Sequence, residues 1–445
     1  MSDAAKELAL LSERIDGRVV THEGPDYDEA RKLANPRFDG VRPLAIVFCA
    51  NPDDVREALA VARRHGLPVA PRSGRHCFAG RSTTDGIVID VTPMNSVNLD
   101  AGIATIGAGA CLAQVYAALH AHGRTIPAGC GATVGIAGLT LGGGIGLLGR
   151  KHGLTCDRLV GARVVLADGR IVDCDADREP ELFWALRGAG GGQFGVVTSL
   201  IFDTVPEPMT TRFELRWSRA PVAEMVAAWQ RWAPGTPDEV TANLTVVAEP
   251  GEPPQAILFG ASLREEAPTR ELLQEFCTVV GASPEVDVRG GLAYHRLKNS
   301  FEDLDPREEP ASGLRIRSEF FARAMRPSTI DALLSTLIDG EATGRRQLTF
   351  TALGGAYNRV PDTATAFVHR RELFILEHIA EAPSAWVDRS WEVAHVDGSG
   401  SVYPNFPDAQ LDDWATAYHA GNYPRLAAAK KAYDPDRLFE FPQSV

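Results

Sequence analysis

The segment Pro71–Gly80 (PRSGRHCFAG) holds several residues that could bind an anion or react with a ligand. A loop this rich in glycine and serine can present successive backbone N–H groups to a pyrophosphate. Arg72 and Arg75 add positive charge. A nearby cation disfavours the protonated imidazole, which would keep His76 neutral and nucleophilic. A single loop of this kind is more often a surface feature, so it predicts a site only together with other segments.

A second segment, 127–146 (PAGCGATVGIAGLTLGGGIG), is unusually rich in glycine. Each interior glycine costs a helix or strand roughly 0.5–1 kcal/mol relative to alanine, so we expect backbone that lies directly against a ligand. The stretch Gly144–Gly149 also matches the GxGxxG pattern of nicotinamide-binding domains, with Asp168 as the acidic partner. However, no β-branched strand precedes it, and Asp168 falls in a hairpin turn, which disfavours this alternative.

The elements around these segments predict the fold. A strand expected at 67–71 leads into the first loop, and a hairpin is expected at 159–174 around Asp168-Gly169. After a linker at 206–208, the predicted strands follow one another with helices between them, as in an antiparallel sheet with one covered face. The chain of 445 residues is longer than one core usually covers. We therefore expect an α+β protein of two domains.

Composition and missing motifs exclude several function classes. The net charge of −13 disfavours nucleic acid and acidic membrane surfaces as partners, and no apolar stretch is long enough for a membrane span. HExxH, GxSxG and P-loop patterns are absent from the sequence, and no histidine cluster has metal-ligand spacing. We expect no metal. Seven scattered cysteines and a polar N-terminus indicate a cytoplasmic protein with free thiols.

Five segments, in their order along the chain, resemble the berberine-bridge-enzyme-like FAD-linked oxidases of the vanillyl-alcohol-oxidase / p-cresol-methylhydroxylase superfamily. They are RSGRHCFAG, PAGCGATVGIAGLTLGGGIG, RKHGLTCD, ELFWALRGAGGGQFGVVT and KKAYDPDRLFEFPQSV. The resemblance implies an FAD-binding domain at 1–208, a substrate-binding domain at 209–400, and a C-terminal segment at 401–445 that returns to the first domain.

The resemblance also implies the residues that hold FAD. His76 matches the histidine that bonds the 8α-methyl carbon of the flavin. The other positions that match the cofactor site are Arg72, Ser73, Gly74, Arg75, Cys77, Gly107, Gly109, Gly129, Cys130, Gly131, Val134, Gly135, Gly138, Leu139, Gly142, Gly143, Gly146, Asp157, Val196, Tyr403 and Asn405. The position that matches the cysteine of a second flavin bond is occupied by Gly131 in this chain, one residue after Cys130. Either the loop shifts so that Cys130 reaches the flavin, or His76 makes the only bond, which we favour.

Two residues are the candidates for catalysis. Glu377 lies in a segment that resembles the strand facing the substrate, where a carboxylate in an apolar cavity would act as acid or base. An ion pair with Arg370 or Arg371 is the alternative. Tyr403, in a YxNYxD-like segment, matches a tyrosine that is a usual candidate for general base, whereas Phe406 replaces a frequent second tyrosine.

The resemblance therefore implies a covalent-FAD oxidase that oxidises an alcohol and returns the electrons to O2 as hydrogen peroxide. A small valine at Val134 favours an oxidase over a dehydrogenase with poor O2 reactivity. The expected substrate is a secondary metabolite, with a carbohydrate or oligosaccharide as the alternative, and the protein is expected to be a monomer or homodimer. The aromatic residues that could line the substrate pocket are Trp217, Tyr294, Phe320, Tyr357 and Trp391.

Overall fold

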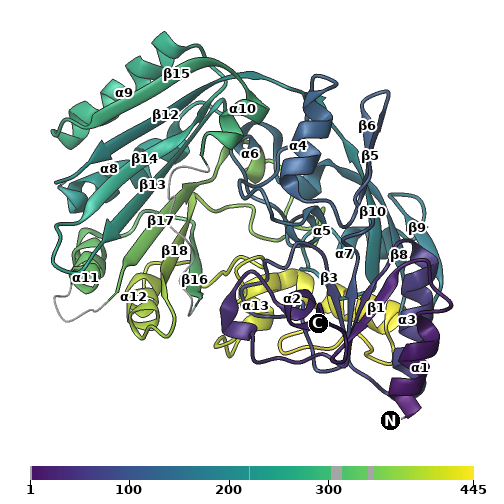
Figure 1. The fold of residues 1–445 in the computed structure, drawn as a ribbon. Helices are drawn as coiled ribbons and strands as arrows, with labels where there is room; N and C mark the ends of the chain where they lie inside the picture. The colour runs from purple at the N-terminus through teal and green to yellow at the C-terminus, as the bar shows by residue number, and fades with distance from the viewer. Residues whose placement is uncertain (1–2, 220, 302–312, 339–343) are drawn as a thin grey trace.

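The computed structural model describes residues 3–219, 221–301, 313–338 and 344–445. The described chain forms two lobes (Figure 1). One lobe holds a four-stranded sheet, a five-stranded sheet and both ends of the chain, and the other holds a seven-stranded sheet covered by helices. This arrangement confirms the expected two-domain α+β fold.

The first sheet of the N-terminal lobe ends beside the loop that contains His76. Its strands, in the order β1-β2-β4-β3, are β1 (Arg18–Thr21), β2 (Ala45–Phe48), β4 (Ile87–Asp90) and β3 (Val69–Arg72), and the last three run parallel. Helix α3 (Pro52–His65) connects β2 to β3. Its first turn is capped by the Asn51 side chain, and it ends at Gly66 in the left-handed region, as the sequence predicts. Strand β3 therefore delivers the loop at the carboxyl edge of a parallel sheet, a usual place for a ligand.

The second sheet of this lobe is antiparallel. Its strands, in spatial order, are β5 (Val97–Asp100), β6 (Ile103–Gly107), β10 (Val196–Asp203), β8 (Leu159–Val165) and β9 (Ile171–Cys174). Strands β8 and β9 form the hairpin predicted around Asp168. The helices of this lobe are α1 (Asp3–Leu11), α2 (Tyr27–Arg31), α4 (Leu112–His120), α5 (Ile136–Leu141), α6 (Gly149–His152) and α7 (Pro180–Ala185). The GxGxxG stretch follows α5 rather than a strand, so it is not a nicotinamide-binding turn.

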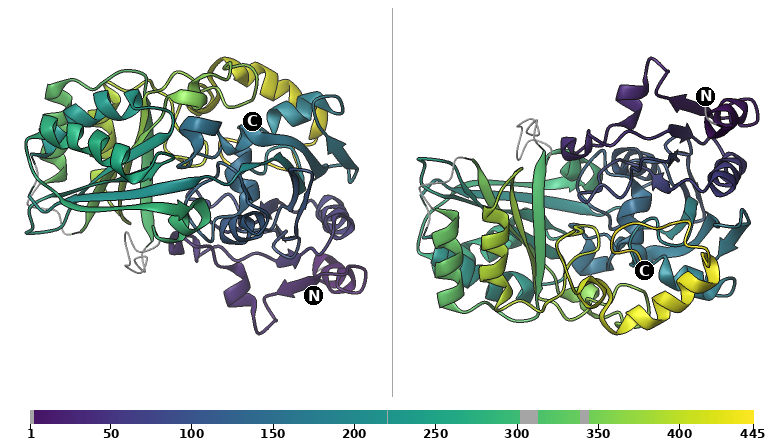
Figure 2. Two further views of the ribbon diagram at one scale, coloured as in Figure 1. Left: turned by 90° about the horizontal axis from the view of Figure 1, so that it is seen from above. Right: turned by 90° about the horizontal axis from the view of Figure 1, so that it is seen from below.

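The large sheet is antiparallel and takes all seven strands from residues 209–381. In spatial order they are β15 (Glu285–Ala293), β12 (Met209–Trp217), β14 (Gln255–Ser262), β13 (Val240–Ala248), β17 (Arg346–Ala352), β18 (Phe374–Glu381) and β16 (Leu314–Phe321). Its helices are α8 (Val222–Trp232), α9 (Glu266–Val280), α11 (Pro327–Leu337) and α12 (Trp386–His395). They bury one face of the sheet in a core that includes Leu244, Phe350 and Leu376. Figure 2 shows these helices gathered on one face of the sheet. Alternate residues of the same strands lie on the other face, and several of them line a cavity.

The last part of the chain packs on the N-terminal lobe. Helices α13 (Trp414–His419) and α14 (Tyr423–Tyr433), yellow in Figure 1, belong to this lobe, where α14 contacts α7. Buried Lys430 of α14 donates hydrogen bonds to the carbonyls of Gln193, at 2.6 Å, and Phe439, at 2.7 Å. The segment that precedes α13, from Val402 onward, therefore crosses between the lobes and is held at both ends.

Several elements of the structure were not predicted from the sequence. The short pair β7 (Arg124–Thr125) and β11 (Val205–Pro206) places the expected linker within a small sheet. Glu207 next to it accepts hydrogen bonds from the His120 ring and from the backbone N–H of His295. His295 belongs to α10 (Tyr294–Asn299), which was not expected either. The junction between the lobes is therefore fixed by side-chain contacts.

Candidate active site

A cavity of about 440 Å³ lies between the two lobes. Four segments line it from the N-terminal lobe and the C-terminal segment: 71–78, 129–147, 190–197 and 403–407. The opposite wall belongs to the face of the large sheet that its helices do not cover, and it consists of Thr241, Asn243, Thr351, Ile375 and Glu377. Cavities of this size between domains commonly bind small molecules or cofactors.

The loop after β3 packs in close contact with the glycine-rich segment. A Cβ atom placed on Gly74 would lie 2.1 Å from the backbone nitrogen of Gly135, so only glycine allows this approach. Arg75 adopts a left-handed φ of 65°, which turns the chain toward the cavity. Within the described residues, the backbone N–H groups of 74–77 donate no hydrogen bond to the protein. They remain available to a ligand that carries negative oxygens.

Arg72 plays a structural part in this loop. Its buried guanidinium donates to Asp90 at 2.8 Å and to the carbonyl of Ala30 at 2.7 Å. Its charge is therefore already paired within the protein. Arg75 lies 4.0 Å from the same Asp90 carboxylate and is partly exposed.

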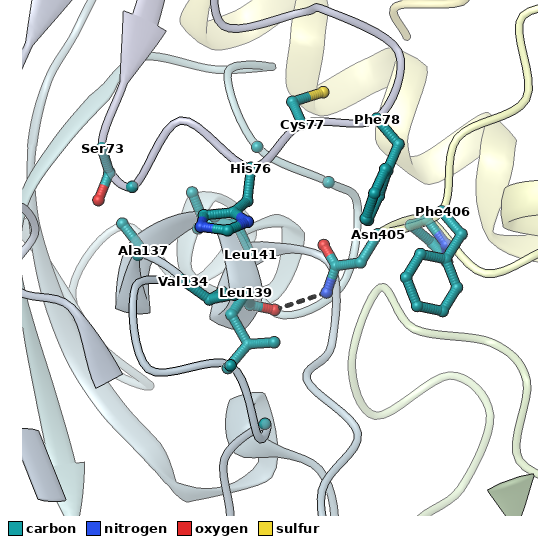
Figure 3. Close-up of a pocket in the computed structure, with 18 of the residues that line it drawn as sticks. Ser73, His76, Cys77, Phe78, Val134, Ala137, Leu139, Leu141, Asn405 and Phe406 are labelled. Carbon is teal, nitrogen blue, oxygen red and sulfur yellow. Dashed lines mark hydrogen bonds between the residues drawn. The ribbon is translucent and has the colours of Figure 1, made fainter. Parts of the chain in front are cut away.

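The His76 side chain extends from this loop into the cavity (Figure 3). Its Nε2 atom lies 2.8 Å from the hydroxyl of Thr133. Burial lowers the pKa of the His76 imidazole, so the ring is neutral at pH 7. The sequence interpretation had the neutral state right but its cause wrong, because burial lowers the pKa and the neighbouring arginines do not.

The glycine-rich segment forms the floor of the cavity. A Cβ atom on Gly138, at the cavity surface, would meet no protein atom within 4 Å, so the backbone there faces open space. Cys130 is exposed to the cavity, and Val134 is half-buried beside it. Of the remaining predicted cofactor residues, those that line the cavity are Ser73, Cys77, Gly129, Gly131, Gly135, Leu139, Gly146, Val196, Tyr403 and Asn405.

Five predicted cofactor residues lie outside the cavity wall. The N–H groups of Gly107 and Gly109 donate to the carbonyls of Ser96 and Met94, so they are not available to a ligand. Gly142 and Gly143 make room for the side chains of Asn405 and Phe367. Asp157 binds Arg370 in a two-point ion pair. These glycines and this aspartate position other parts of the protein, and the sequence pattern alone does not distinguish that use from contact with a ligand.

Tyr403 is almost completely buried, and its hydroxyl oxygen is surrounded by donors. The backbone N–H groups of Gly144 and Ile145 reach it at 3.0 and 3.1 Å, and the Nδ2 of Asn405 reaches it at 3.0 Å. Burial raises the pKa of Tyr403 to about 12, although these three donors act in the opposite direction. The hydroxyl oxygen therefore serves first as an acceptor that fixes the turn at 144–145.

Glu377 on β18 lines the cavity and has no charged partner among the described residues. Burial alone raises the pKa of its carboxyl group to about 8. The expected alternative, an ion pair with a neighbouring arginine, is wrong: Arg370 pairs with Asp157, and Arg371 with Asp362. Glu377 lies beside Ser318 and Thr349 on the two adjacent strands. It is a carboxyl group near neutrality in a position to exchange a proton with a ligand.

The wall around Glu377 is polar rather than aromatic. Thr241, Asn243 and Thr351 contribute hydroxyl and amide groups from β13 and β17. None of the five aromatic residues expected in a substrate pocket lines this cavity. Trp217 and Tyr294 lie in buried cores. Phe320 packs near Tyr403, and the Tyr357 hydroxyl makes a hydrogen bond with the backbone of Gly146. Trp391 stacks against the guanidinium group of Arg317. The aromatic residues at the cavity other than Tyr403 are Phe78 and Phe406, whose ring centroids are 5.7 Å apart.

Sequence reasoning missed several residues of this site. Gly190, Gly191 and Gly192 line the cavity, and Gly191 lies beside Gly138. The GAGGG run that contains them was a signal in the sequence. Thr133 gave no signal, because its role depends on the approach of two loops that are distant in sequence. Asn243 and Thr351 belong to ordinary strands and become site residues only through the pairing of β13 with β17.

The cavity suits the FAD that the resemblance implies. Open backbone at Gly138 and Gly191 provides a flat floor, and the unused N–H groups of 74–77 lie at one side of it. A flat ring system and a pyrophosphate require these two surfaces. In the described chain, no group of three or more metal-ligating side chains occurs, and no helix is long and apolar enough to cross a membrane.

Comparison with known proteins gives matches along the whole chain. A family described as an FAD binding domain matches residues 43–175, and a family described as berberine and berberine like matches residues 402–445. Both matches contain cavity-lining segments: the first includes His76 and the glycine-rich floor, and the second includes Tyr403 and Asn405.

Individual relatives match over nearly their full length. The chain is 35% identical to an uncharacterized FAD-linked oxidoreductase, YgaK, of Bacillus subtilis, with 97% of each protein covered. It is 31% identical to a chitooligosaccharide oxidase of Gibberella zeae, with 91% of this chain and 87% of that protein covered. Among solved structures, the BBE-like 1 protein of Physcomitrella patens superposes with a TM-score of 0.90 at 26% identity, with 98% of each chain covered.

Proposed function

The chain belongs to the berberine-bridge-enzyme-like FAD-linked oxidoreductases, and we propose that it is an oxidase that holds FAD covalently through His76 and oxidises an alcohol carbon of a small molecule. Its cofactor is FAD. One observation carries the proposal: a single cavity joins the His76 loop and the glycine floor to the unpaired carboxyl group of Glu377. A cofactor on the floor would lie across from this acid–base group.

The chemistry that bound FAD supplies is acceptance of a hydride from the substrate carbon, followed by its reoxidation by dioxygen with release of hydrogen peroxide. Glu377 accepts the proton of the substrate hydroxyl as the hydride leaves. With a pKa of about 8, it is protonated at lower pH and becomes a competent base as the pH rises through that value. The polar groups of Thr241, Asn243 and Thr351 bind and orient the substrate beside it.

Tyr403 is assigned a different role in this mechanism. Its hydroxyl oxygen accepts hydrogen bonds from three N–H donors, two of which belong to the backbone at 144–145. A base must bring its oxygen to a substrate proton, and this oxygen is directed at the protein. Tyr403 positions the floor of the cavity and the Asn405 side chain, and Glu377 is the catalytic base.

Val134 and Cys130 concern the reaction of the flavin with dioxygen and the number of its covalent bonds. Val134 lines the cavity next to Gly131. We expect its small side chain to let dioxygen reach the flavin, as in an oxidase rather than a dehydrogenase. Cys130 is exposed to the same cavity. We favour His76 as the single point of attachment, with a Cys130 bond as the alternative.

The substrate belongs to one of two classes, a secondary metabolite or a carbohydrate. The polar wall around Glu377 and the similarity to a chitooligosaccharide oxidase favour the carbohydrate. A substrate with several hydroxyl groups can hydrogen-bond to threonine and asparagine side chains, whereas a flat aromatic metabolite finds only Phe78 and Phe406 there. The seven described cysteines are all unpaired, which supports a location in the reducing cytoplasm.

The test is hydrogen peroxide release by the purified holoprotein, without added flavin, across a panel of sugars, oligosaccharides and aromatic alcohols. The proposal predicts peroxide with at least one alcohol. Turnover of sugars alone would assign the carbohydrate class, and turnover of aromatic alcohols alone would assign the metabolite class. Rapid reduction of the flavin by a substrate, followed by slow reoxidation in air, would overturn the oxidase assignment.

A further inference from the structure

The loop that contains His76 and the turn that contains Thr133 are locked together by their backbones. A Cβ atom on Gly74 would lie 2.1 Å from the nitrogen of Gly135 and 2.9 Å from the carbonyl oxygen of Thr133. A Cβ atom on Gly135 would lie 2.4 Å from the nitrogen of Gly74. The two backbones are therefore in close contact, and this contact brings the side chains of His76 and Thr133 near each other.

The turn is also anchored from behind by α4. The N–H groups of Leu112 and Ala113 donate to the carbonyls of Val134 and Ala132, both at 3.0 Å. These two carbonyls flank Thr133 in sequence. The position of the Thr133 backbone therefore does not depend on His76. The turn is already ordered before a ligand enters the cavity.

Within this fixed frame, the hydroxyl of Thr133 lies 2.8 Å from Nε2 of His76. A neutral imidazole has its proton on one nitrogen and a lone pair on the other. Among the described residues, Nδ1 of His76 has no hydrogen-bond partner. A proton on Nδ1 would have no acceptor in the protein, whereas a proton on Nε2 is accepted by Thr133.

We propose that Thr133 is the positioning residue for flavin attachment: its hydroxyl accepts the Nε2 proton of His76 and thereby leaves the Nδ1 lone pair free to bond the flavin. This inference rests on the proposed function, because it assumes that His76 is the point of attachment. Burial of the imidazole supports it by keeping the ring neutral.

Flavin attachment to His76 exchanges one covalent bond for another and releases two electrons and two protons. A bond forms between Nδ1 of His76 and the 8α-methyl carbon, and one C–H bond of that methyl group breaks. The imidazole then loses its Nε2 proton, and the Thr133 hydroxyl can turn to donate to the Nε2 lone pair that remains. The two electrons left on the cofactor pass to dioxygen, the oxidant of the proposed activity. The methyl hydrogen and the imidazole proton complete one hydrogen peroxide.

The test compares the holoproteins of Thr133→Val, Thr133→Ala and Thr133→Ser. Valine has nearly the shape of threonine without its hydroxyl group, alanine is a second variant without it, and serine retains it. Total flavin is measured from absorbance, and the covalent fraction from the flavin that stays with the polypeptide after acid precipitation. Because Thr133 is exposed, all three variants should fold and bind FAD.

We expect the serine variant to resemble the parent, whereas the valine and alanine variants keep their total flavin but lose most of the covalent fraction. Equal covalent fractions in the serine and valine variants, reached at equal rates, would overturn the role of Thr133 and leave the oxidase proposal intact. A parent protein that binds FAD only non-covalently would overturn the attachment and this inference together. A parent without any flavin would overturn the proposed function itself.

Discussion

Arg370 holds Asp157 through two hydrogen bonds, at 2.8 and 2.6 Å, and joins the segment before β18 to the N-terminal lobe. This ion pair engages one of the two arginines that precede Glu377 in the chain, and the other, Arg371, pairs with Asp362. Among the described residues, the Glu377 carboxyl group at the cavity has no charged partner, and burial is the cause of its raised pKa. A buried carboxyl group without a cation keeps its proton to a higher pH. With both arginines paired elsewhere, burial alone raises the pKa of the Glu377 carboxyl group.

The pH dependence of activity follows from Glu377. Because burial raises its pKa to about 8, the basic form that accepts a proton accumulates above that pH. We expect kcat/KM to rise as the pH increases toward 8 and to level off beyond it. Glu377→Gln should keep its flavin, lose about 10²–10⁴-fold in kcat/KM and lose this pH dependence. Stopped-flow measurement of flavin reduction would check both points, and a variant with the activity and pH profile of the parent would contradict the assignment.

Gly138 tests the cofactor floor without disturbing the protein core. A Cβ atom there meets no protein atom within 4 Å, so Gly138→Ala should fold with the stability of the parent. The new methyl group should nevertheless occupy the surface on which the flavin ring lies and reduce the flavin content. Gly421→Ala is the matched control, since its Cβ is equally unobstructed and the residue is absent from the cavity wall. Full flavin content in Gly138→Ala would place the cofactor elsewhere.

Tyr403→Phe separates positioning from catalysis. Removal of the hydroxyl leaves the N–H groups of Gly144 and Ile145 without their acceptor, which should cost about 1–3 kcal/mol in the free energy of unfolding. The variant should retain the pH dependence that Glu377 produces, at a lower rate. Denaturant unfolding and the pH profile of flavin reduction are the measurements. Loss of the pH dependence with unchanged stability would instead identify Tyr403 as the base.

Val134→Leu tests the path of dioxygen. A larger side chain at this position of the cavity wall should slow reoxidation of the flavin and leave its reduction by substrate unchanged. The two half-reactions can be followed separately by mixing with substrate under anaerobic conditions and then with oxygenated buffer. Unchanged reoxidation would mean that dioxygen approaches by another route.

Much of the fold was predictable because local signals agree with the tertiary structure. Asn51 and Gly66 mark the ends of α3, and Asp168-Gly169 marks the turn between β8 and β9. Strand β15 was missed because its alternation is weak and much of it is exposed at the edge of the sheet.

The site was predictable to a lesser degree, and the reason is physical. His76 and the glycine floor have local motifs, so they could be found from the sequence. Gly107 and Gly143 look the same in sequence as Gly138, yet they make room for the protein itself. The role of Glu377 depends on the absence of a nearby cation, and that of Thr133 on contact between two loops. Such relationships exist only in the folded chain.

The central claim is that FAD is bound to the polypeptide through His76, across the cavity from Glu377. The most direct measurement is the intact mass of the purified protein after denaturation in acid and removal of free flavin, compared with that of His76→Ala. Attachment through His76 predicts that the parent polypeptide gains the mass of one FAD and that the variant releases its flavin. Complete loss of flavin from the parent, or its retention by His76→Ala, would contradict attachment through this residue.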